Sequence, residues 1–176
     1  MLQEVSLMDM LDFRERKAGC LQRLKTDYPN AVIITLGMNI PGPHKTGPDI
    51  NLAFCAGCRK ISEVLNANGL TLVKEESCQE TAGYIEYYVV ESEDVITVKR
   101  LMVEIEDTHP VGRLFDIDVY RADGSGISRK DISVEERKCL ICGNSAKACG
   151  RSRTHSVEEL EAKVKEIIKN YSQQEV

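Results

Sequence analysis

Residues 112–119 read GRLFDIDV and place two carboxylates two residues apart in an otherwise apolar, β-prone run. In an extended strand alternate side chains share a face, so Asp116 and Asp118 point one way while Phe115, Ile117 and Val119 point the other. Two like charges on one face repel, and a divalent cation or a group of basic side chains usually compensates them. The stretch therefore predicts a strand whose acidic face is either a Mg²⁺ site or a solvated edge.

The rest of the chain alternates between helical and strand patterns, which predicts an α+β fold. Apolar periodicity favours helices over residues 6–28, 49–68 (with Asp49 as its N-cap), 95–105 and 157–171, and strands over 31–36, 70–74 and 83–91. Three prolines make residues 39–48 an ordered loop, and we expect residues 127–150 to be irregular after a turn at 123–126. The expected architecture is a mixed or antiparallel sheet with flanking helices, followed by a small cysteine-containing C-terminal module that ends in a helix.

Length and composition indicate one domain in a reducing compartment. The 176 residues, with 42% hydrophobic and 29% charged side chains, suit a single domain over residues 1–176, divided into an α+β core (1–135) and a Cys/Arg/His segment with the closing helix (136–176). No run is long enough to cross a membrane, and the first residues lack the pattern of a secretion signal. Seven cysteines, an odd number, indicate reduced thiols or metal ligands. We therefore expect a cytoplasmic protein without a membrane partner.

The charge is unevenly distributed along the chain. The net charge of −5 disfavours general nucleic-acid binding, so we expect no nucleic-acid partner. Between residues 121 and 155, however, eight Lys and Arg side chains stand against four acidic ones. A basic region next to a D-x-D strand suits a small polyanionic substrate, although scattered basic side chains on a solvated surface produce the same count.

A metal-ligand pattern lies within this basic region. Cys139 and Cys142 form a C-x2-C-G element, and Cys149 and His155 follow downstream. Such an element is typical of a zinc knuckle, and the four side chains would complete a Cys₃His tetrahedron. The alternative is a set of buried free thiols beside a functional His155.

Basic side chains at two places could bind phosphate groups. Lys45 stands on the proline-rich loop, and Arg151 and Arg153 lie two residues apart just before His155. Guanidinium groups bind phosphate in a bidentate manner and a lysine acts as a point charge. Each of these side chains could instead be an exposed basic residue without a ligand.

Five motifs in order resemble the citrate lyase holo-acyl-carrier-protein synthases, also called apo-citrate lyase phosphoribosyl-dephospho-CoA transferases. These motifs are NIPGP at 39–43 with Lys45, HPVGRLFDIDV at 109–119, ISR at 127–129, RKCLIC at 137–142 and CGRSRTH at 149–155. The resemblance covers nearly the whole chain. It implies an enzyme that attaches 2′-(5″-triphosphoribosyl)-3′-dephospho-CoA to a serine of the acyl-carrier (gamma) subunit of citrate lyase, with release of pyrophosphate.

The implied chemistry assigns a role to each candidate residue. Asp116 and Asp118 would hold Mg²⁺, with Glu106 preferred over Glu104 and Asp123 as a third ligand. The triphosphate or the CoA phosphate would be bound by basic side chains, namely Lys45, Arg113, Arg129, Arg151, Arg153 and His155. His109, or with less support His155, would orient or deprotonate the incoming serine. Zn²⁺ would be a second metal, at Cys139, Cys142, Cys149 and His155.

Two alternatives stay open at this point. The chain could be a non-catalytic zinc-binding interaction module, or the related transferase for the carrier protein of malonate decarboxylase. Many nucleotidyltransferases also place a Gly-Ser pair about ten residues before the D-x-D strand, whereas Gly112-Arg113 directly precedes it here. A nucleotidyltransferase-type reaction therefore rests on the acidic pair alone.

Overall fold

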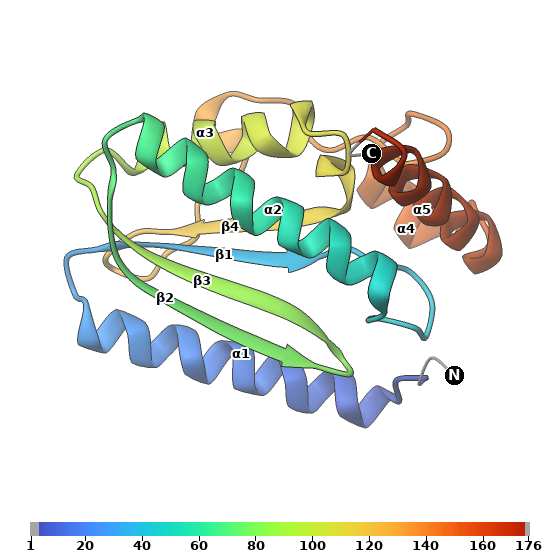
Figure 1. Ribbon diagram of the computed structural model, residues 1–176, viewed down its shortest axis with the longest axis horizontal. Helices are drawn as coiled ribbons and strands as arrows, with labels where there is room; N and C mark the ends of the chain where they lie inside the picture. Colours follow the sequence, from blue (N-terminus) through green and yellow to red (C-terminus); the bar gives the residue numbers. More distant parts are fainter. Residues whose placement is uncertain (1–3, 175–176) are drawn as a thin grey trace.

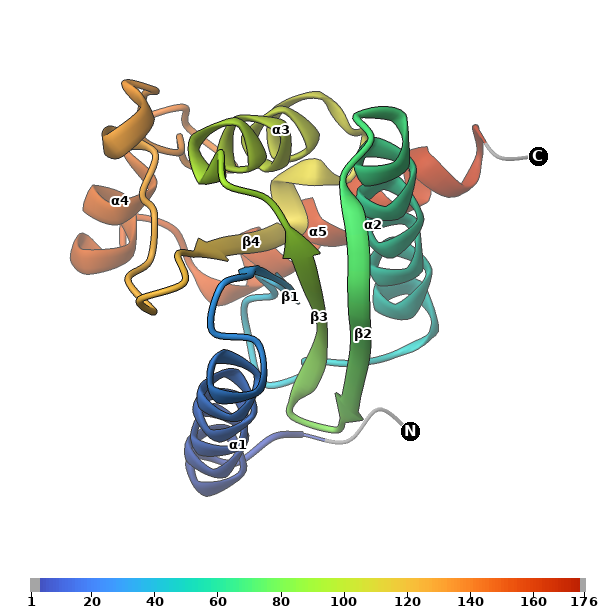
Figure 2. The same cartoon turned by 90° about the vertical axis from the view of Figure 1, so that its left-hand side faces the viewer.

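The computed structural model describes residues 4–174, which form one antiparallel sheet with helices on both faces (Figures 1 and 2). The strands lie in the order β2-β3-β1-β4, and all neighbours are antiparallel. The elements are α1 (Leu7–Asp27), β1 (Val32–Met38), α2 (Pro48–Ala67), β2 (Thr71–Glu80), β3 (Gly83–Glu91), α3 (Val95–Thr108), η1 (Gly112–Leu114), β4 (Phe115–Tyr120), η2 (Lys130–Ile132), α4 (Ala146–Ser152) and α5 (Val157–Ser172). The predicted α+β class, with an antiparallel sheet and a cysteine cluster before a closing helix, is confirmed.

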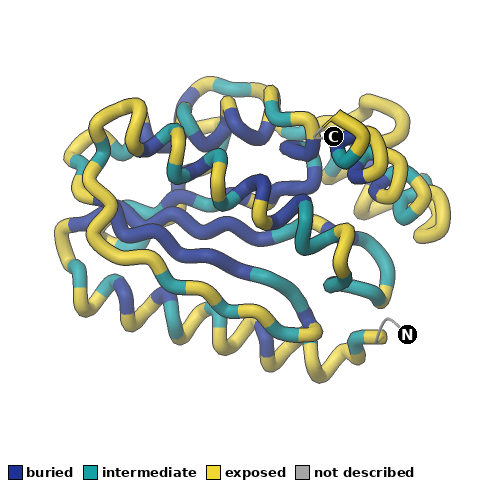
Figure 3. Tube along the Cα trace, in the orientation of Figure 1, coloured by how far each residue is buried: buried dark blue, intermediate teal, exposed yellow. Residues whose placement is uncertain are grey.

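Two apolar layers hold the helices against the sheet. Helix α1 packs on one face through Phe13, Leu21 and Leu24, while α2 and α3 cover the opposite face (Figure 1). Helix α5 contributes Val164 and Ile168 to the second layer, at the end of the sheet where β1 ends and β4 begins. The buried parts of the chain follow β1, β3 and the inner sides of these helices (Figure 3). Apolar burial on both faces therefore fixes β1 and β3 in the centre.

Local signals in the sequence explain where the helices begin. Ser6 and Ser156 each form a capping box at the start of α1 and α5, and Asp94 accepts a hydrogen bond from the backbone N–H of Thr97 at the start of α3. The predicted N-cap at Asp49 is wrong. Helix α2 instead begins at Pro48, with Gly47 in the cap position, because proline suits the first helical position.

Two predicted segments differ from the structure. Strand β2 continues to Glu80, six residues beyond the predicted end, and pairs with β3 along its length. Residues 75–80 are mostly polar because β2 is the exposed edge strand, so they lack the alternation that marks a half-buried strand. The segment expected to be irregular contains the short helix α4 and the 3-10 turn η2.

No helix within residues 4–174 is both long enough and apolar enough to span a membrane.

Candidate functional site

Strand β4 separates its side chains onto two faces as predicted. Phe115, Ile117 and Val119 are buried against α2 and α3, whereas Asp116 is exposed and Asp118 is half-buried on the face that α1 covers in part. Antiparallel pairing places Asp116 opposite Gly37 and Asp118 opposite Thr35 of β1. The two carboxylates therefore share one face of the sheet.

One lysine and one tyrosine contact this acidic pair. Lys17 of α1 places Nζ 3.7 Å from Oδ2 of Asp118, and the Tyr120 hydroxyl donates to the same oxygen over 3.5 Å. The pKa of Asp116 is raised above the ordinary aspartate value, first by desolvation and then by the negative charge of Asp118. The pair thus carries more negative charge than its neighbours compensate, which is the donor chemistry that a hard cation such as Mg²⁺ requires.

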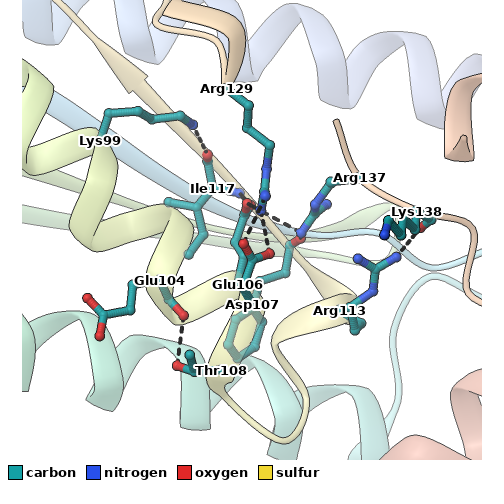
Figure 4. Close-up of polar contacts among 11 residues, drawn as sticks. Lys99, Glu104, Glu106, Asp107, Thr108, Arg113, Ile117, Arg129, Arg137 and Lys138 are labelled. Atoms are coloured by element: carbon teal, nitrogen blue, oxygen red, sulfur yellow. Dashed lines mark hydrogen bonds and ion pairs between the residues drawn. The ribbon is translucent and has the colours of Figure 1, made fainter. Parts of the chain in front are cut away.

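Glu106 lies at the free edge of β4, where it is paired with arginines (Figure 4). The residue is 4% exposed, and its carboxylate lies 2.7 Å from Nη2 of Arg129 and 3.1 Å from Nη2 of Arg137. The backbone N–H of Ile117 donates to Oε1 over 3.0 Å. These contacts favour an anchoring role for Glu106 over the metal-ligand role that its sequence position suggested. Arg129, which also binds Asp107, is likewise engaged within the protein.

A cavity of about 650 Å³ lies between η1, the segment 137–155 and the start of α5. Its basic lining comes from Arg113, Arg137, Lys138, Arg153 and His155, and Asn39 and Pro41 enter from the loop after β1. The pKa of Arg113 is lowered, first by burial and then by the nearby charge of Arg137. Several cations held together in a partly dehydrated hollow form a binding site for a polyanion.

Arg137 connects the cavity with the acidic pair. It lines the cavity, donates a hydrogen bond to the carbonyl of Phe115, and its charge acts on the Asp116 carboxylate. Asp116 and Asp118 themselves do not line the cavity. Arg113 also links η1 to the segment 137–155, because it donates a hydrogen bond to the carbonyl of Lys138. Sequence reasoning did not identify Arg137, Lys138 and Asn39 as site residues. Arg137 and Lys138 nevertheless lie in the stretch with excess positive charge, residues 121–155.

Three other candidates lie outside this cavity. Lys45 donates to the Ile40 carbonyl over 2.6 Å, and burial lowers its pKa. Arg151 is exposed on α4. The ring of His109 packs 5.3 Å from that of Phe115 and 5.6 Å from that of Tyr171, and its Nδ1 accepts the backbone N–H of Val111. None of these described side chains lines the cavity.

The predicted metal ligands come together. The ligand atoms of Cys139, Cys142, Cys149 and His155 all lie within 4.8 Å of one another, and the sulfurs of Cys142 and Cys149 are 3.5 Å apart. Among the His, Cys, Asp and Glu side chains of residues 4–174, this is the one group of three or more that could hold a metal ion. Asp116, Asp118 and Glu106 do not form such a group.

Local backbone geometry builds this Cys₃His cluster. The turn after Cys142 contains Gly143 at φ 73°, a left-handed conformation that glycine adopts at low cost, and the N–H of Cys139 bonds to the Asn144 carbonyl. The pKa of Cys142 is lowered to about 6, first because a backbone N–H at Asn144 donates to its sulfur and then because His155 lies nearby. Nε2 of His155 is buried without a hydrogen-bond partner among the described residues. A thiolate-prone sulfur and an unpartnered imidazole nitrogen fit a metal ligand set.

Comparison with known proteins places the chain in a family. A model of the family "Apo-citrate lyase phosphoribosyl-dephospho-CoA transferase" matches residues 5–171. A protein of Streptococcus pyogenes serotype M18 named "Probable apo-citrate lyase phosphoribosyl-dephospho-CoA transferase" is 34% identical over 177 residues, covering 96% of this chain and 88% of its own length. A Vibrio cholerae protein with the same name is 36% identical over 140 residues, covering 80% of this chain and 79% of its own.

A longer relative contains the same unit as one part. The Haemophilus influenzae "Protein CitXG" is 30% identical over 168 residues, which are 96% of this chain and 36% of that protein. The family and the Streptococcus pyogenes and Vibrio cholerae relatives share the transferase name, and the resemblance read from the five motifs is confirmed. This chain therefore belongs to the apo-citrate lyase phosphoribosyl-dephospho-CoA transferase family.

Proposed function

We propose that this transferase attaches 2′-(5″-triphosphoribosyl)-3′-dephospho-CoA to a serine of the acyl-carrier subunit of citrate lyase. The observation that carries the proposal is the cavity lined by four Lys and Arg side chains, which Arg137 connects to the acidic pair of β4. A triphosphate is a compact polyanion, and guanidinium groups match its oxygens in charge and geometry. We assign Arg113, Arg137, Lys138 and Arg153 to these phosphate contacts.

The reaction is a nucleotidyltransferase-type displacement at the phosphorus next to the ribose. The serine Oγ forms a bond to this phosphorus, the bond to the bridging oxygen of the pyrophosphate breaks, and pyrophosphate departs with the electron pair. The arginines of the cavity stabilise the charge that grows on the phosphate oxygens. The serine proton leaves to solvent water, because Asp116 and Asp118 are assigned to the metal ion and Asp116 is exposed. His109 is less well placed to accept this proton, since it packs between two aromatic rings outside the cavity.

Asp116 and Asp118 are the residues that would hold Mg²⁺. Bound there, the ion would neutralise phosphate charge beside the arginines. Zn²⁺ is the ion we propose for the Cys₃His cluster, because three sulfurs and one imidazole nitrogen form its preferred tetrahedral set. Four side-chain ligands leave no open position, so the zinc role is to hold residues 137–155 in place beside the cavity.

Intact mass spectrometry of the carrier protein tests the transfer. The enzyme is incubated with the precursor, Mg²⁺ and the apo acyl-carrier subunit of citrate lyase, with the carrier of malonate decarboxylase in a parallel reaction. We expect the mass of the prosthetic group to appear on the citrate lyase carrier, together with one pyrophosphate per transfer. A carrier whose acceptor serine is replaced by alanine should gain nothing. An unchanged mass of the folded native carrier would contradict the proposal. Modification of the malonate decarboxylase carrier alone would show that this carrier, and not that of citrate lyase, is the acceptor.

The acidic pair provides the matching test within the enzyme. Asp118→Asn should lower the transfer rate by on the order of 10²–10³-fold, because it removes the charge of one of the two carboxylates that would hold Mg²⁺, while keeping the side-chain shape. Glu104→Gln is the matched control, since Glu104 is exposed and points away from the polar network (Figure 4). Equal transfer rates for the two variants would show that the acidic pair takes no part in the reaction.

A further inference from the structure

The free edge of β4 is satisfied by groups that come from outside the sheet. Along this edge the carbonyl of Phe115 accepts from Arg137, the N–H of Ile117 donates to Glu106, and the carbonyl of Ile117 accepts from Nζ of Lys99 over 3.0 Å. The carbonyl of Val119 accepts from the N–H of Ile127 over 2.8 Å. A set of side chains and one loop residue therefore takes the place of a fifth strand.

Glu106 is at the centre of this arrangement (Figure 4). Its buried carboxylate contacts the edge of β4, Arg129 and Arg137 at once. Burying a carboxylate is costly unless cations and hydrogen bonds compensate it, so these three contacts hold one another in place. Gly112 permits the close approach of the chain here, because a Cβ atom at that position would lie 2.6 Å from the backbone oxygens of Ile105 and Glu106.

The position of Arg137 depends on this carboxylate. Nη2 of its guanidinium contacts both the Phe115 carbonyl and Oε1 of Glu106, and the same side chain lines the cavity. Without the Glu106 contact one backbone carbonyl would hold a long side chain that has many rotamers. A guanidinium fixed in advance loses less freedom when it binds phosphate, which raises affinity.

We propose that Glu106 is a positioning residue, which aims Arg137 at the phosphate groups of the substrate while Lys99 and Glu106 together fix the edge of the strand that carries Asp116 and Asp118. The proposal rests on the proposed function in one respect, because it takes the anion in the cavity to be the substrate triphosphate. It assigns Glu106 to neither the metal nor the reacting atoms.

The neighbouring acid provides a matched control. Asp107 follows Glu106 in α3, but its side chain is 43% exposed, and it forms its ion pair with Arg129 rather than with Arg137. Glu106→Gln and Asp107→Asn each remove one negative charge from the same turn of helix. They differ in that only the first removes the charge that holds Arg137.

Binding of inorganic triphosphate, measured by titration calorimetry, tests the proposal without relying on turnover. We expect Glu106→Gln to weaken binding about tenfold, the loss typical of one charge-assisted hydrogen bond, and Asp107→Asn to change it less than about twofold. In the transfer assay the KM for the precursor should rise more than kcat falls. If folded Glu106→Gln binds triphosphate as tightly as the wild type, the proposal is overturned.

A double-mutant cycle separates positioning from a general structural effect. In the background of Arg137→Gln, the added change Glu106→Gln should cost almost no further affinity, because its partner is already gone. Equal losses in both backgrounds would show that Glu106 does not act through Arg137. Should Glu106→Gln not fold, Arg137→Lys examines the same contact. Lysine keeps the charge but loses the forked geometry, so we expect several-fold weaker binding, and unchanged binding would overturn the proposal.

The wild-type protein distinguishes this proposal from the proposed function. If it neither binds triphosphate nor modifies the carrier, the proposed function fails. If it does both and Glu106→Gln behaves in the same way, only the positioning role fails.

Discussion

The sheet and the segment that contains the cysteine cluster are held together by different forces. In the sheet, Ile34, Leu36 and Val119 are fully buried between layers of helices. Most of residues 133–156 is exposed (Figure 3), and Cys149 is the single buried residue of this segment. Hydrogen bonds of Arg113 and Arg137 hold the segment to the core, and Leu140 adds a partly buried apolar contact. The sheet thus has an apolar core of its own, whereas we propose that the segment depends on a metal ion at its Cys₃His cluster. The proposed site requires both, because Asn39, Pro41 and Arg113, which lie next to the sheet, line the same cavity as residues of the segment.

Loss of the metal should have the largest effect, and only in the segment. Structural zinc contributes apparent free energies of about 10–16 kcal/mol in small domains, far more than one buried residue can supply. We expect Cys149→Ser to lose zinc and to expose the amides of residues 136–156 to rapid hydrogen exchange, while β1 and β3 stay protected. Elemental analysis and exchange mass spectrometry measure the two effects.

The control for this experiment is Cys55→Ser, because Cys55 is an exposed cysteine on α2 outside the cluster. It should keep its zinc and its exchange pattern. Unchanged protection of residues 136–156 in Cys149→Ser would show that the segment does not need the cluster.

Truncation in the sheet should show the opposite pattern. Leu36→Ala leaves a cavity in a fully buried site, so we expect the free energy of unfolding to fall by about 2–5 kcal/mol. Zinc content per folded chain should stay the same. Denaturant unfolding measures the loss, and Leu7→Ala, at a site 76% exposed, should change it by less than about 0.5 kcal/mol. Zinc loss in folded Leu36→Ala would contradict the independence of the two regions.

Two arginines of the segment differ in whether they are placed to contact the substrate. Arg153 lines the cavity and Arg151, two residues earlier, does not. We expect Arg153→Gln to raise the KM for the precursor about tenfold, as the loss of a charge-assisted contact does, and Arg151→Gln to change it less. Steady-state kinetics compares the pair. A larger effect at Arg151 would mean that the substrate leaves the cavity and crosses α4.

The smallest effect concerns the stability of the acidic face. Because the pKa of Asp116 is raised in the folded state, its ionised form destabilises the fold above that pKa, and the penalty disappears as the pH falls through it. Asp116→Asn should therefore stabilise the protein at neutral pH, by less than about 1 kcal/mol because solvent screens this exposed group. Thermal unfolding at neutral and at acidic pH should show the gain only at neutral pH. A loss of stability at neutral pH would contradict this account of the acidic pair.

The sequence predicts those parts of the fold and of the candidate site that depend on residues close together in the chain. The alternation of Phe115, Ile117 and Val119 with two aspartates predicts the faces of β4, and the spacing of Cys139 and Cys142 predicts the ligand turn. The sequence pattern predicts too early an end for strand β2, because residues 75–80 are polar and lie at an exposed edge of the sheet. The role of Glu106 could not be read from sequence, because its partners Arg129 and Arg137 lie more than twenty positions away and meet it only in the folded protein.

The central claim is that the sheet edge and the metal-held segment together form one anion site. Calorimetric titration of inorganic triphosphate into the zinc-loaded protein and into the same protein after chelation tests this most directly, with the folded sheet checked by hydrogen exchange of β1 and β3. The account predicts binding to the loaded form and at least a roughly tenfold weaker affinity after zinc removal. Equal affinity in the two forms would contradict it.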